Sequence, residues 1–535
     1  MRRLLLLFFF SFQVSGQIWE KIYPGYELAG SSNQAVQCYD KGIAIVSLEI
    51  MGNSYNYGNF FKMDINGNIL DSSILTAGNG SWYVEMGITK DNGFIISGST
   101  DILDTNDSDP LLLKLDVCGQ KQWCAVFPHD YLGAFVEQVK QTSDGGYAVV
   151  LDNFGTIYTL CRLDSSGKFL WAYTCPYTSP NAMLAEKNGS ILISGSNYTP
   201  NLSNPGLLDF RAFTAKISAS GNIIWENNYG IKQQAEANLL SIVKTKDNGY
   251  LSLVGQSNPP LSGGGFNLLM KQDSSGNVLW AKPLDSNLYG DVAYSMTYDS
   301  TDSNYIALVI HVDTLGNTYS SLVKFDSTGH VLKTRSYSND GWNVTDFQII
   351  PTYDHKFLVS GNYGTVNNGA TYGFHLYKVN SDLSPADWDT GHFIYNGLCP
   401  NMPKSDTLNL DGYFIVNFDT ANERQFADSN INTQDYSTLT NIAPVKNSLL
   451  KITISPNPFS DILHVTIISS DNFNHNSTLR VVNSLGVTVQ SQVINIEAQS
   501  TMDFFLNLSG LSSGYYHIEI QDAENLLYNN GFIKN

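Results

Sequence analysis

The order of apolar and polar positions repeats along most of the chain with a period of about 53 residues. One recurring phrase follows an apolar strand and has a basic residue, an apolar residue, usually Asp, two small residues and Gly. Its basic residue occurs at seven places: Lys62, Lys114, Arg162, Lys216, Lys271, Lys324 and Lys378. A second phrase, a polar turn such as Asp144–Gly146, precedes each of these by about 25 residues, and such turns favour hairpins because they accommodate positive φ.

Each unit therefore contains two hairpins, whose four strands are termed A to D in chain order. In the third unit we predict strand A near residues 135–142, B at 147–151, C at 157–163 and D at 168–174. A Trp often closes strand D, where its simplest role is packing between units. Seven four-stranded units with almost no helical periodicity predict an all-β fold, a seven-bladed β-propeller over residues 17–383.

The seventh unit lacks a good strand D after Lys378, and the N-terminus offers one. Residues Trp19–Gly25 resemble Trp225–Gly230, which close the fourth unit. We expect residues 17–24 to pair into the last blade and latch the ring, which would leave no long edge strand exposed.

The loops predict which face of the disc binds a ligand. Strand directions place the short A–B and C–D turns on one face and the longer B–C and D–A loops on the other. Long, variable loops on a rigid scaffold commonly carry binding sites, and their aromatic side chains could stack on sugars or contact a protein. The alternative is that they are ordinary exposed aromatics of an aromatic-rich chain. The candidates on this loop face are Asp101, Asp104, Asp107, Asp109, Tyr131, Tyr198, Phe266, Trp342 and Tyr363.

The acidic loop 101–109 could hold Ca²⁺, which prefers several oxygen ligands on a flexible turn. It lacks the Gly and the distal Glu of an EF-hand loop, so the pattern favours a solvated acidic loop instead. No other cofactor is indicated by the sequence.

Sequence signatures of common enzyme classes are absent. The chain has no HExxH, GxSxG or Walker motif, and its nine His are scattered. Catalytic carboxylates in a propeller can come from distant blades, so the sequence leaves that arrangement open. Asp in the repeat turns is explained as a turn former. We therefore expect binding rather than catalysis.

Charge and the N-terminus indicate an exported chain that does not bind nucleic acid. The 535 residues carry a formal net charge of −19, which repels phosphate backbones, although solubility also explains this charge. Arg2 and Arg3 precede an apolar run over residues 4–12 and small residues at 14–16, which is typical of a secretory signal peptide over residues 1–16. No other stretch is long and apolar enough for a transmembrane span, so we expect none in the mature chain.

Export also permits disulfides. Cys118 and Cys124 flank one predicted hairpin turn, and Cys161 and Cys175 flank the next. Each pair could form a local disulfide or remain as buried thiols. No spacing of Cys and His suggests zinc.

The repeat breaks after Leu383. Residues 384–447 contain Pro-rich and polar stretches, and we interpret them as a loosely structured linker in which some strand could form at 413–418. Alternation returns from Leu449 and gives about seven short strands, which predict an Ig-like β-sandwich over residues 448–535.

The C-terminal motifs resemble a known family. Ser-Pro-Asn-Pro-Phe, Leu-Gly, Gly-Tyr-Tyr and a terminal Phe-Ile-Lys are similar to the type A C-terminal sorting domain of the type IX (Por) secretion system. The matching residues, which also suit turns and strands, are Pro456, Asn457, Pro458, Gly486, Gly514 and Lys534. The resemblance implies that the type IX machinery is a partner, and that the chain crosses the inner and then the outer membrane. It implies that this domain is not catalytic. It also implies that the protein is either anchored at the cell surface or released.

The sequence thus predicts a cell-surface or extracellular protein. Its propeller is expected to be a binding platform for glycan or protein, and its C-terminal domain is expected to direct secretion. Two alternatives remain open: a propeller enzyme acting on polysaccharide, and a structural component of a surface layer.

Overall fold

The computed structural model describes residues 18–27, 34–49, 57–76, 81–103, 108–127, 134–153, 157–176, 178–200, 208–230, 237–257, 265–284, 292–312, 318–337, 342–365, 371–399, 407–409, 412–416, 423–425, 432–435, 450–455, 461–469, 475–483, 488–497, 500–511, 514–522 and 525–534. Regular structure in these residues is β-strand throughout. Within them there is accordingly no helix of the length and hydropathy needed to cross a membrane. The chain divides into two compact units, Met1–Leu439 and Thr440–Asn535.

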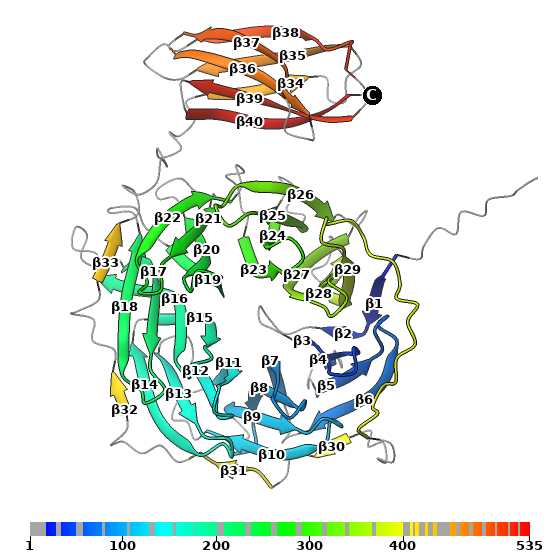
Figure 1. Ribbon diagram of the computed structural model, residues 1–535, viewed down its shortest axis with the longest axis vertical. Helices are drawn as coiled ribbons and strands as arrows, with labels where there is room; N and C mark the ends of the chain where they lie inside the picture. Colours follow the sequence, from blue (N-terminus) through cyan, green and yellow to red (C-terminus); the bar gives the residue numbers. More distant parts are fainter. Residues whose placement is uncertain are drawn as a thin grey trace, which may run out of the picture. The chain divides into compact units, whose positions relative to one another are not determined.

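Seven antiparallel sheets form the first unit and lie as blades around a ring, with strand A innermost and strand D at the rim (Figure 1). Blades 1 and 2 contain β3 (Ala35–Gln37), β4 (Ile43–Glu49), β5 (Tyr57–Met63) and β6 (Ile69–Thr76), then β7 (Ser81–Ile88), β8 (Phe94–Thr100), β9 (Asp109–Leu115) and β10 (Lys121–Val126). Blades 3 and 4 contain β11 (Phe135–Gln141), β12 (Tyr147–Asn153), β13 (Ile157–Leu163) and β14 (Phe169–Pro176), then β15 (Thr178–Ala185), β16 (Ile191–Pro200), β17 (Leu208–Ile217) and β18 (Ile223–Gly230). Blades 5 and 6 contain β19 (Ala237–Lys244), β20 (Tyr250–Ser257), β21 (Gly265–Gln272) and β22 (Val278–Pro283), then β23 (Val292–Asp299), β24 (Asn304–Val312), β25 (Thr318–Phe325) and β26 (Val331–Tyr337).

The seventh blade closes the ring with the N-terminus, as the sequence predicts. It contains β27 (Trp342–Pro351), β28 (Phe357–Thr365), β29 (Thr371–Val379) and, as strand D, β1 (Glu20–Pro24). β1 pairs antiparallel with β29, with Glu20 opposite Tyr377 and Pro24 opposite Gly373. A short strand, β2 (Tyr26–Glu27), then pairs with β4 and carries the chain into blade 1. The prediction of a seven-bladed, all-β propeller is confirmed.

The Trp that closes strand D packs between blades. Trp171 of blade 3 is buried, and its Nε1 donates a hydrogen bond to the backbone oxygen of Ala219 in the C–D turn of blade 4 at 3.2 Å. Gly221 of that turn has a φ of +80°, and a Cβ there would lie 2.9 Å from the Trp171 ring. The glycine of the repeat is therefore required both by backbone conformation and by the neighbouring indole.

The two recurring phrases meet inside a blade as an ion pair that the sequence analysis did not predict. In blade 3, Arg162 Nη2 lies 2.5 Å from Asp144 Oδ1, and the guanidinium is buried while the carboxylate is largely exposed. Burial alone would raise the pKa of Asp144, but hydrogen bonds from Thr142 and Gly146 and the charge of Arg162 lower it to about 2. Equivalent pairs are Lys114–Asp91, Lys216–Glu186, Lys271–Asp247, Lys324–Asp299 and Lys378–Asp354.

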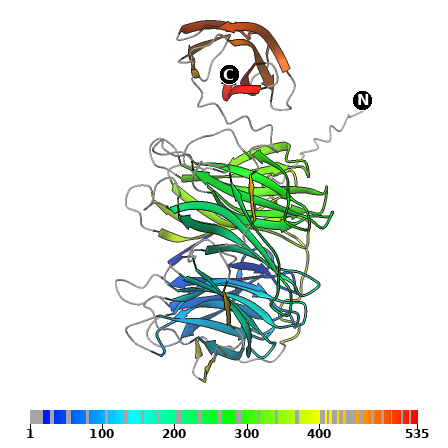
Figure 2. The same ribbon diagram turned by 90° about the vertical axis from the view of Figure 1, so that its left-hand side faces the viewer.

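Four short strands after the seventh blade lie on the rim of the ring. They pair parallel to strand D of blades 1 to 4: β30 (Thr407–Asn409) with β6, β31 (Phe414–Ile415) with β10, β32 (Glu423–Gln425) with β14 and β33 (Asn432–Asp435) with β18. These four strands are termed the belt, and Figure 2 shows β32 and β33 on the outside of the disc. The strand expected at 413–418 is present as β31, and β30, β32 and β33 are further strands in this stretch that the sequence did not predict. They form because the outer strands offer unpaired backbone groups.

The disulfide in the described residues joins Cys118 to Cys399, which are 281 positions apart. Cys124, Cys161 and Cys175 are buried thiols. The local pairings considered from the hairpin spacing are therefore wrong, and the buried-thiol alternative holds for these three residues. Hairpin spacing could not reveal that Cys118 bonds to Cys399, because Cys399 follows the last blade in sequence.

The second unit contains two antiparallel sheets. One holds β34 (Leu450–Ser455), β35 (Ile462–Ser469) and β38 (Thr501–Asn507), and the other holds β36 (His475–Asn483), β37 (Thr488–Ile496), β39 (Gly514–Asp522) and β40 (Asn525–Lys534). Both sheets contribute to one buried cluster, with Val465 from β35, Val481 from β36 and Ile518 from β39. Shared burial of these apolar faces holds the two sheets together.

Candidate functional site

The predicted loop face lies where strands B end and strands C and A begin. Tyr198 is near the end of β16, Phe266 near the start of β21, Trp342 at the start of β27 and Tyr363 near the end of β28. Asp104, Asp107 and Tyr131 lie outside the described residues. The structure therefore provides the backbone frame of this face in blades 4, 5 and 7.

Blade 7 brings two of the predicted aromatic residues together. Trp342 pairs in register with Thr365, and Tyr363 pairs with Val344 on the same two strands. Tyr363 is partly buried, and burial raises the pKa of its hydroxyl. Tyr198 and Phe266 belong to blades 4 and 5, so the strands that carry the aromatic candidates come from three blades.

The acidic loop of blade 2 is partly held by one of its own carboxylates. Asp109 is 5% exposed, and its Oδ2 accepts a hydrogen bond from the backbone nitrogen of Leu103 at 3.2 Å. Asp101 is half-buried. Within the described ranges no three His, Cys, Asp or Glu side chains are placed to hold a metal ion. Ca²⁺ binding by this loop stays a prediction, because Asp104 and Asp107 fall outside those ranges.

The inner wall of the ring carries a feature that the sequence analysis missed. Strand A of blades 2 to 7 has a β-bulge at the same position, and one residue in each is skipped by the pairing. Bulges re-aim side chains and occur next to active sites. The skipped residues are Val84, Glu137, Asn181, Leu240, Tyr294 and Phe347.

Residues directly after the bulge connect neighbouring blades. Glu85 Oε2 of blade 2 accepts a hydrogen bond from the backbone nitrogen of Val139 in blade 3 at 2.7 Å. Gln348 of blade 7 donates to the backbone oxygen of Ala35 and accepts from its nitrogen, both at 3.0 Å. In blades 2 and 7 the residue after the bulge therefore connects neighbouring blades, and the skipped residue differs in chemistry from blade to blade.

Glu137 is the chemically distinctive member of this inner wall. Its Oε2 is shielded from solvent and has no hydrogen-bond partner. Burial, followed by the negative charges of Asp152 and Glu85, raises the pKa of Glu137 to about 8, so the side chain holds a proton at neutral pH. Glu85 itself is paired with Lys140 at 2.5 Å. A Glu between Val136 and Gln138 in the innermost strand of a blade is the weak sequence signal for this residue.

A second buried charged group lies in blade 7 beside the closing strand. His375 is 3% exposed, with Nε2 2.9 Å from Glu20 Oε1 and Nδ1 3.9 Å from Asp346 Oδ1. Burial lowers the pKa of His375, but the nearby carboxylates of Asp346 and Glu20 raise it to about 9. The positive imidazolium thus links β1 to the body of blade 7.

The sorting-motif residues fall in the second unit. Gly514 opens β39 and pairs in register with Lys534 of β40, and Lys534 is buried. The structure therefore joins the two motif positions that are described. Pro456, Asn457, Pro458 and Gly486 lie outside the described residues.

The family model for the secretion system C-terminal sorting domain matches residues 453–534. The chain therefore carries a type IX sorting domain at its C-terminal end and is an exported protein. No curated protein matches the sequence.

Solved structures resemble the chain only distantly. Drosophila Semaphorin 2a is 7% identical with a TM-score of 0.41, and the match covers 97% of each chain. A protein of unknown function from Bacteroides caccae is 12% identical with a TM-score of 0.32, covering 52% of this chain and 88% of that one. An α-L-arabinofuranosidase from Lactobacillus brevis is 9% identical with a TM-score of 0.30, covering 46% and 91%. Because all three TM-scores are below 0.5, these likenesses carry no argument about this protein.

Proposed function

We propose that this exported propeller protein, which carries a type IX sorting domain, binds a glycan or a protein at the cell surface or outside the cell. The sorting match over residues 453–534 supports the address. Residues 1–16 act as the signal for the inner membrane, and the sorting domain, an Ig-like β-sandwich, engages the type IX machinery to cross the outer membrane.

The different uses of the two faces support the binding role. On the turn face, buried basic residues pair with turn carboxylates, and turn Asp residues bond backbone nitrogens, as Asp164 does with Ser166 and Lys168. That face is therefore occupied by contacts that order each blade and its turns. The opposite face carries the longer loops with the aromatic and acidic candidates, and exposed loops on a rigid scaffold are suited to recognition.

Deletion of residues 449–535 tests whether the sorting domain directs export across the outer membrane. We expect the full chain at the cell surface or in the medium, and the truncated chain retained inside the cell with its propeller folded. Fractionation followed by immunodetection measures this, with a type IX-deficient strain as the control. Undiminished export of the truncated chain contradicts the proposal.

A glycan array probed with the full chain tests the binding role. We expect one class of glycan to be retained by the wild type and lost in Trp342→Ala and Tyr363→Ala, because both residues frame the loop face of blade 7. Phe505→Ala is the matched control, since Phe505 is a 70% exposed aromatic of the second unit. If neither the array nor a panel of surface proteins gives a signal sensitive to the blade 7 substitutions, the loop-face proposal fails.

The protonated Glu137 favours hydrolysis of a polysaccharide as the second candidate function. A carboxyl group that keeps its proton at neutral pH can act as a general acid, and glycosidases pair such a group with a second carboxylate. Release of reducing sugar from a polysaccharide panel, abolished in Glu137→Gln, would establish this activity. Retention of a ligand without turnover favours the binding role.

A further inference from the structure

The segment that follows the last blade crosses the seam where the ring closes. Residues 385–399, termed the strap, lie between β29 and the first belt strand in sequence. The strap contacts the N-terminal strand region, the turns of blades 7 and 1, and finally a turn of blade 2.

At the seam, the strap holds the residues that lead into β1. The backbone nitrogen of Trp19 donates to the oxygen of Ala386 at 2.8 Å, and Ile18 forms a backbone bridge with Asp387. Trp388 Nε1 donates to the oxygen of Ile18 at 3.0 Å. Lys21 of β1 places its Nζ 4.8 Å from the centre of the Trp388 ring. The start of the strap therefore forms a second layer of contacts outside the ring-closing strand.

Further along, Asp389 of the strap joins blade 7 to blade 1. Its Oδ2 accepts a hydrogen bond from Tyr353 in the A–B turn of blade 7 at 2.9 Å. Its backbone nitrogen and oxygen both bond the Asn66 side chain in the C–D turn of blade 1, each at 2.8 Å. The seam is thus bridged by one strap residue with partners on both sides.

Blade 1 differs from the other blades because the strap enters its ion pair. In blade 1 the repeat lysine, Lys62, donates to Asn396 Oδ1, and the backbone nitrogen of Asn396 donates to Asp40 Oδ2 at 3.0 Å. The amide of Asn396 therefore stands between the basic and acidic residues that pair directly in later blades. Tyr39 adds a bond from the nitrogen of Leu398 to its hydroxyl at 3.3 Å.

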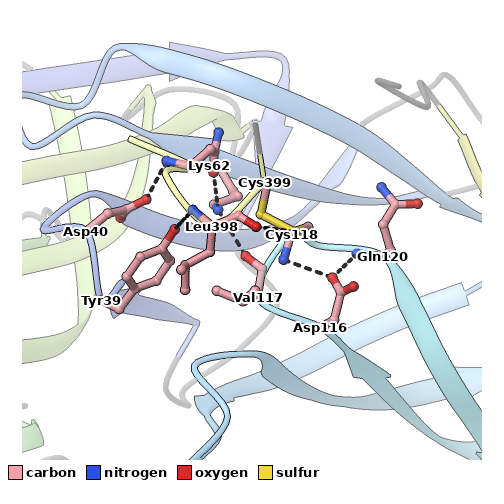
Figure 3. The surroundings of a disulfide bond; sticks show 10 residues. Tyr39, Asp40, Lys62, Asp116, Val117, Cys118, Gln120, Leu398 and Cys399 are labelled. Atoms are coloured by element: carbon pink, nitrogen blue, oxygen red, sulfur yellow. Dashed lines mark hydrogen bonds between the residues drawn. A yellow bond between two sulfur atoms is a disulfide. The ribbon is translucent and has the colours of Figure 1, made fainter. Parts of the chain in front are cut away.

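The far end of the strap is fixed covalently. Figure 3 shows Cys399 joined to Cys118 in the C–D turn of blade 2, beside Lys62 and Asp40 of blade 1. Asp116 Oδ1 accepts hydrogen bonds from the nitrogens of Cys118 and Gln120, both at 2.8 Å, and so fixes the turn that carries Cys118. The disulfide therefore attaches the strap to an ordered turn of blade 2, which is not one of the two blades that meet at the seam.

We propose that the strap is a disulfide-dependent lock that holds the ring-closing strand β1 in blade 7. Without the strap, β1 is held by its pairing with β29, by the contact of Glu20 with His375, and by side-chain hydrogen bonds to the C–D turn of blade 1. With Cys399 bonded to Cys118, the strap cannot leave the seam by diffusion, so its bonds to residues 18, 19 and 21 re-form whenever they break. Opening of the ring then requires the strap to detach together with β1.

The other cysteines favour a single pairing. Cys38, Cys124, Cys161 and Cys175 are all buried. Burial raises the pKa of Cys38, Cys124 and Cys175 to about 12, which keeps these thiols protonated and poor in thiol–disulfide exchange. Oxidation of the folded chain outside the cytoplasm therefore yields the lock rather than a mixture of disulfides.

Hydrogen–deuterium exchange on the full chain tests the lock with three samples: oxidised wild type, wild type treated with dithiothreitol, and Cys118→Ser/Cys399→Ser. Dithiothreitol reduces the disulfide to two thiols and becomes a cyclic disulfide itself. In both samples without the disulfide we expect amide exchange in residues 18–24 and in the strap to accelerate about 10- to 100-fold. Blade 5 is the internal control and is expected to exchange at an unchanged rate.

A second variant separates the lock from general stabilisation. Trp388→Ala keeps both cysteines and removes the strap side chain that contacts Ile18 and Lys21. We expect faster exchange in residues 18–24 although mass spectrometry still detects the disulfide. In Cys118→Ser/Cys399→Ser, treatment with dithiothreitol should cause no further change in the exchange rates. Unchanged exchange in residues 18–24 without the disulfide, or an equal increase in all seven blades, overturns the proposal.

Discussion

The rim of blades 1 to 4 differs from the rim of blades 5 and 6. In blades 1 to 4 the outer strand is covered by a parallel belt strand, whereas no described strand covers β22 or β26. Uncovered β26 carries two charged residues, Lys333 and Arg335. Uncovered β22 and covered β6, β10 and β18 carry one charged residue each, and covered β14 carries none. Charged residues on an edge strand discourage pairing with another chain. The comparison indicates that a belt strand protects the edges of blades 1 to 4, whereas charge is available to protect the uncovered edge of blade 6.

Replacement of the inter-blade Trp should have the largest effect, and it should differ between the two regions. Trp171→Ala in covered blade 3 removes a buried indole that packs on Gly221, so we expect a loss of about 3–5 kcal/mol in the free energy of unfolding. Trp280→Ala in uncovered blade 5 should cost less, because Trp280 is partly exposed. Denaturant titration measures both, and equal losses would contradict the distinction.

Removal of a belt side chain should have the next largest effect. Phe414 of β31 packs against Trp123 and the turn at Gly167, so Phe414→Ala should lower the free energy of unfolding by about 2 kcal/mol. Ile415→Ala is the matched control from the same strand, because Ile415 is 45% exposed and should cost less than about 0.5 kcal/mol. If the two variants are equally stable in thermal unfolding, the belt contributes no packing to blade 2.

The outer strand of blade 7 is held by charge and should therefore depend on pH. The pKa of His375 is raised from 6.5 to about 9, so its stabilising contribution is complete below pH 6.5 and is lost as pH rises through 9. Glu20→Gln should cost about 1 kcal/mol at pH 6, since Glu20 is partly exposed, and much less at pH 10. Thermal unfolding at both pH values measures the difference. A cost that does not change with pH would argue against the ion pair.

Substitution of the charged edge residues should have the smallest effect on stability. Lys333→Val with Arg335→Val in β26 should change the free energy of unfolding by less than about 0.5 kcal/mol, because the strand is largely exposed. We expect the variant to aggregate faster in light scattering, since an uncovered apolar edge can pair with another copy. Lys333→Glu with Arg335→Glu is the control that keeps charge and should remain dispersed.

The sequence was sufficient to predict the ring of blades but not the belt strands or the disulfide that attach to it. The period of the two phrases predicted the blades, and in blade 3 the predicted strand C over residues 157–163 coincides with β13 (Ile157–Leu163). The belt strands are two to four residues long and show no apolar alternation, so their pairing depends on edges that exist only in the folded ring. The partner of Cys118 could not be derived either, because cysteine spacing does not determine connectivity.

The candidate site was predicted less completely than the fold. Strand direction placed Tyr198, Phe266, Trp342 and Tyr363 at one end of the blades, as the structure has them. Glu137 was missed because its distinctive chemistry comes from a one-residue bulge and from neighbours in other strands, Glu85 and Asp152. Such a group arises from tertiary structure and leaves only a weak trace in a single sequence.

The belt also determines how the export tag can be moved to other proteins. Since Asp435 still pairs in blade 4, residues 436–449 alone separate the ring from the first tail strand. A fusion that includes everything after Leu383 would carry the four belt strands and Cys399 without the blades to which they pair and bond. A fusion that begins after Asp435 would carry the sorting domain without any belt strand.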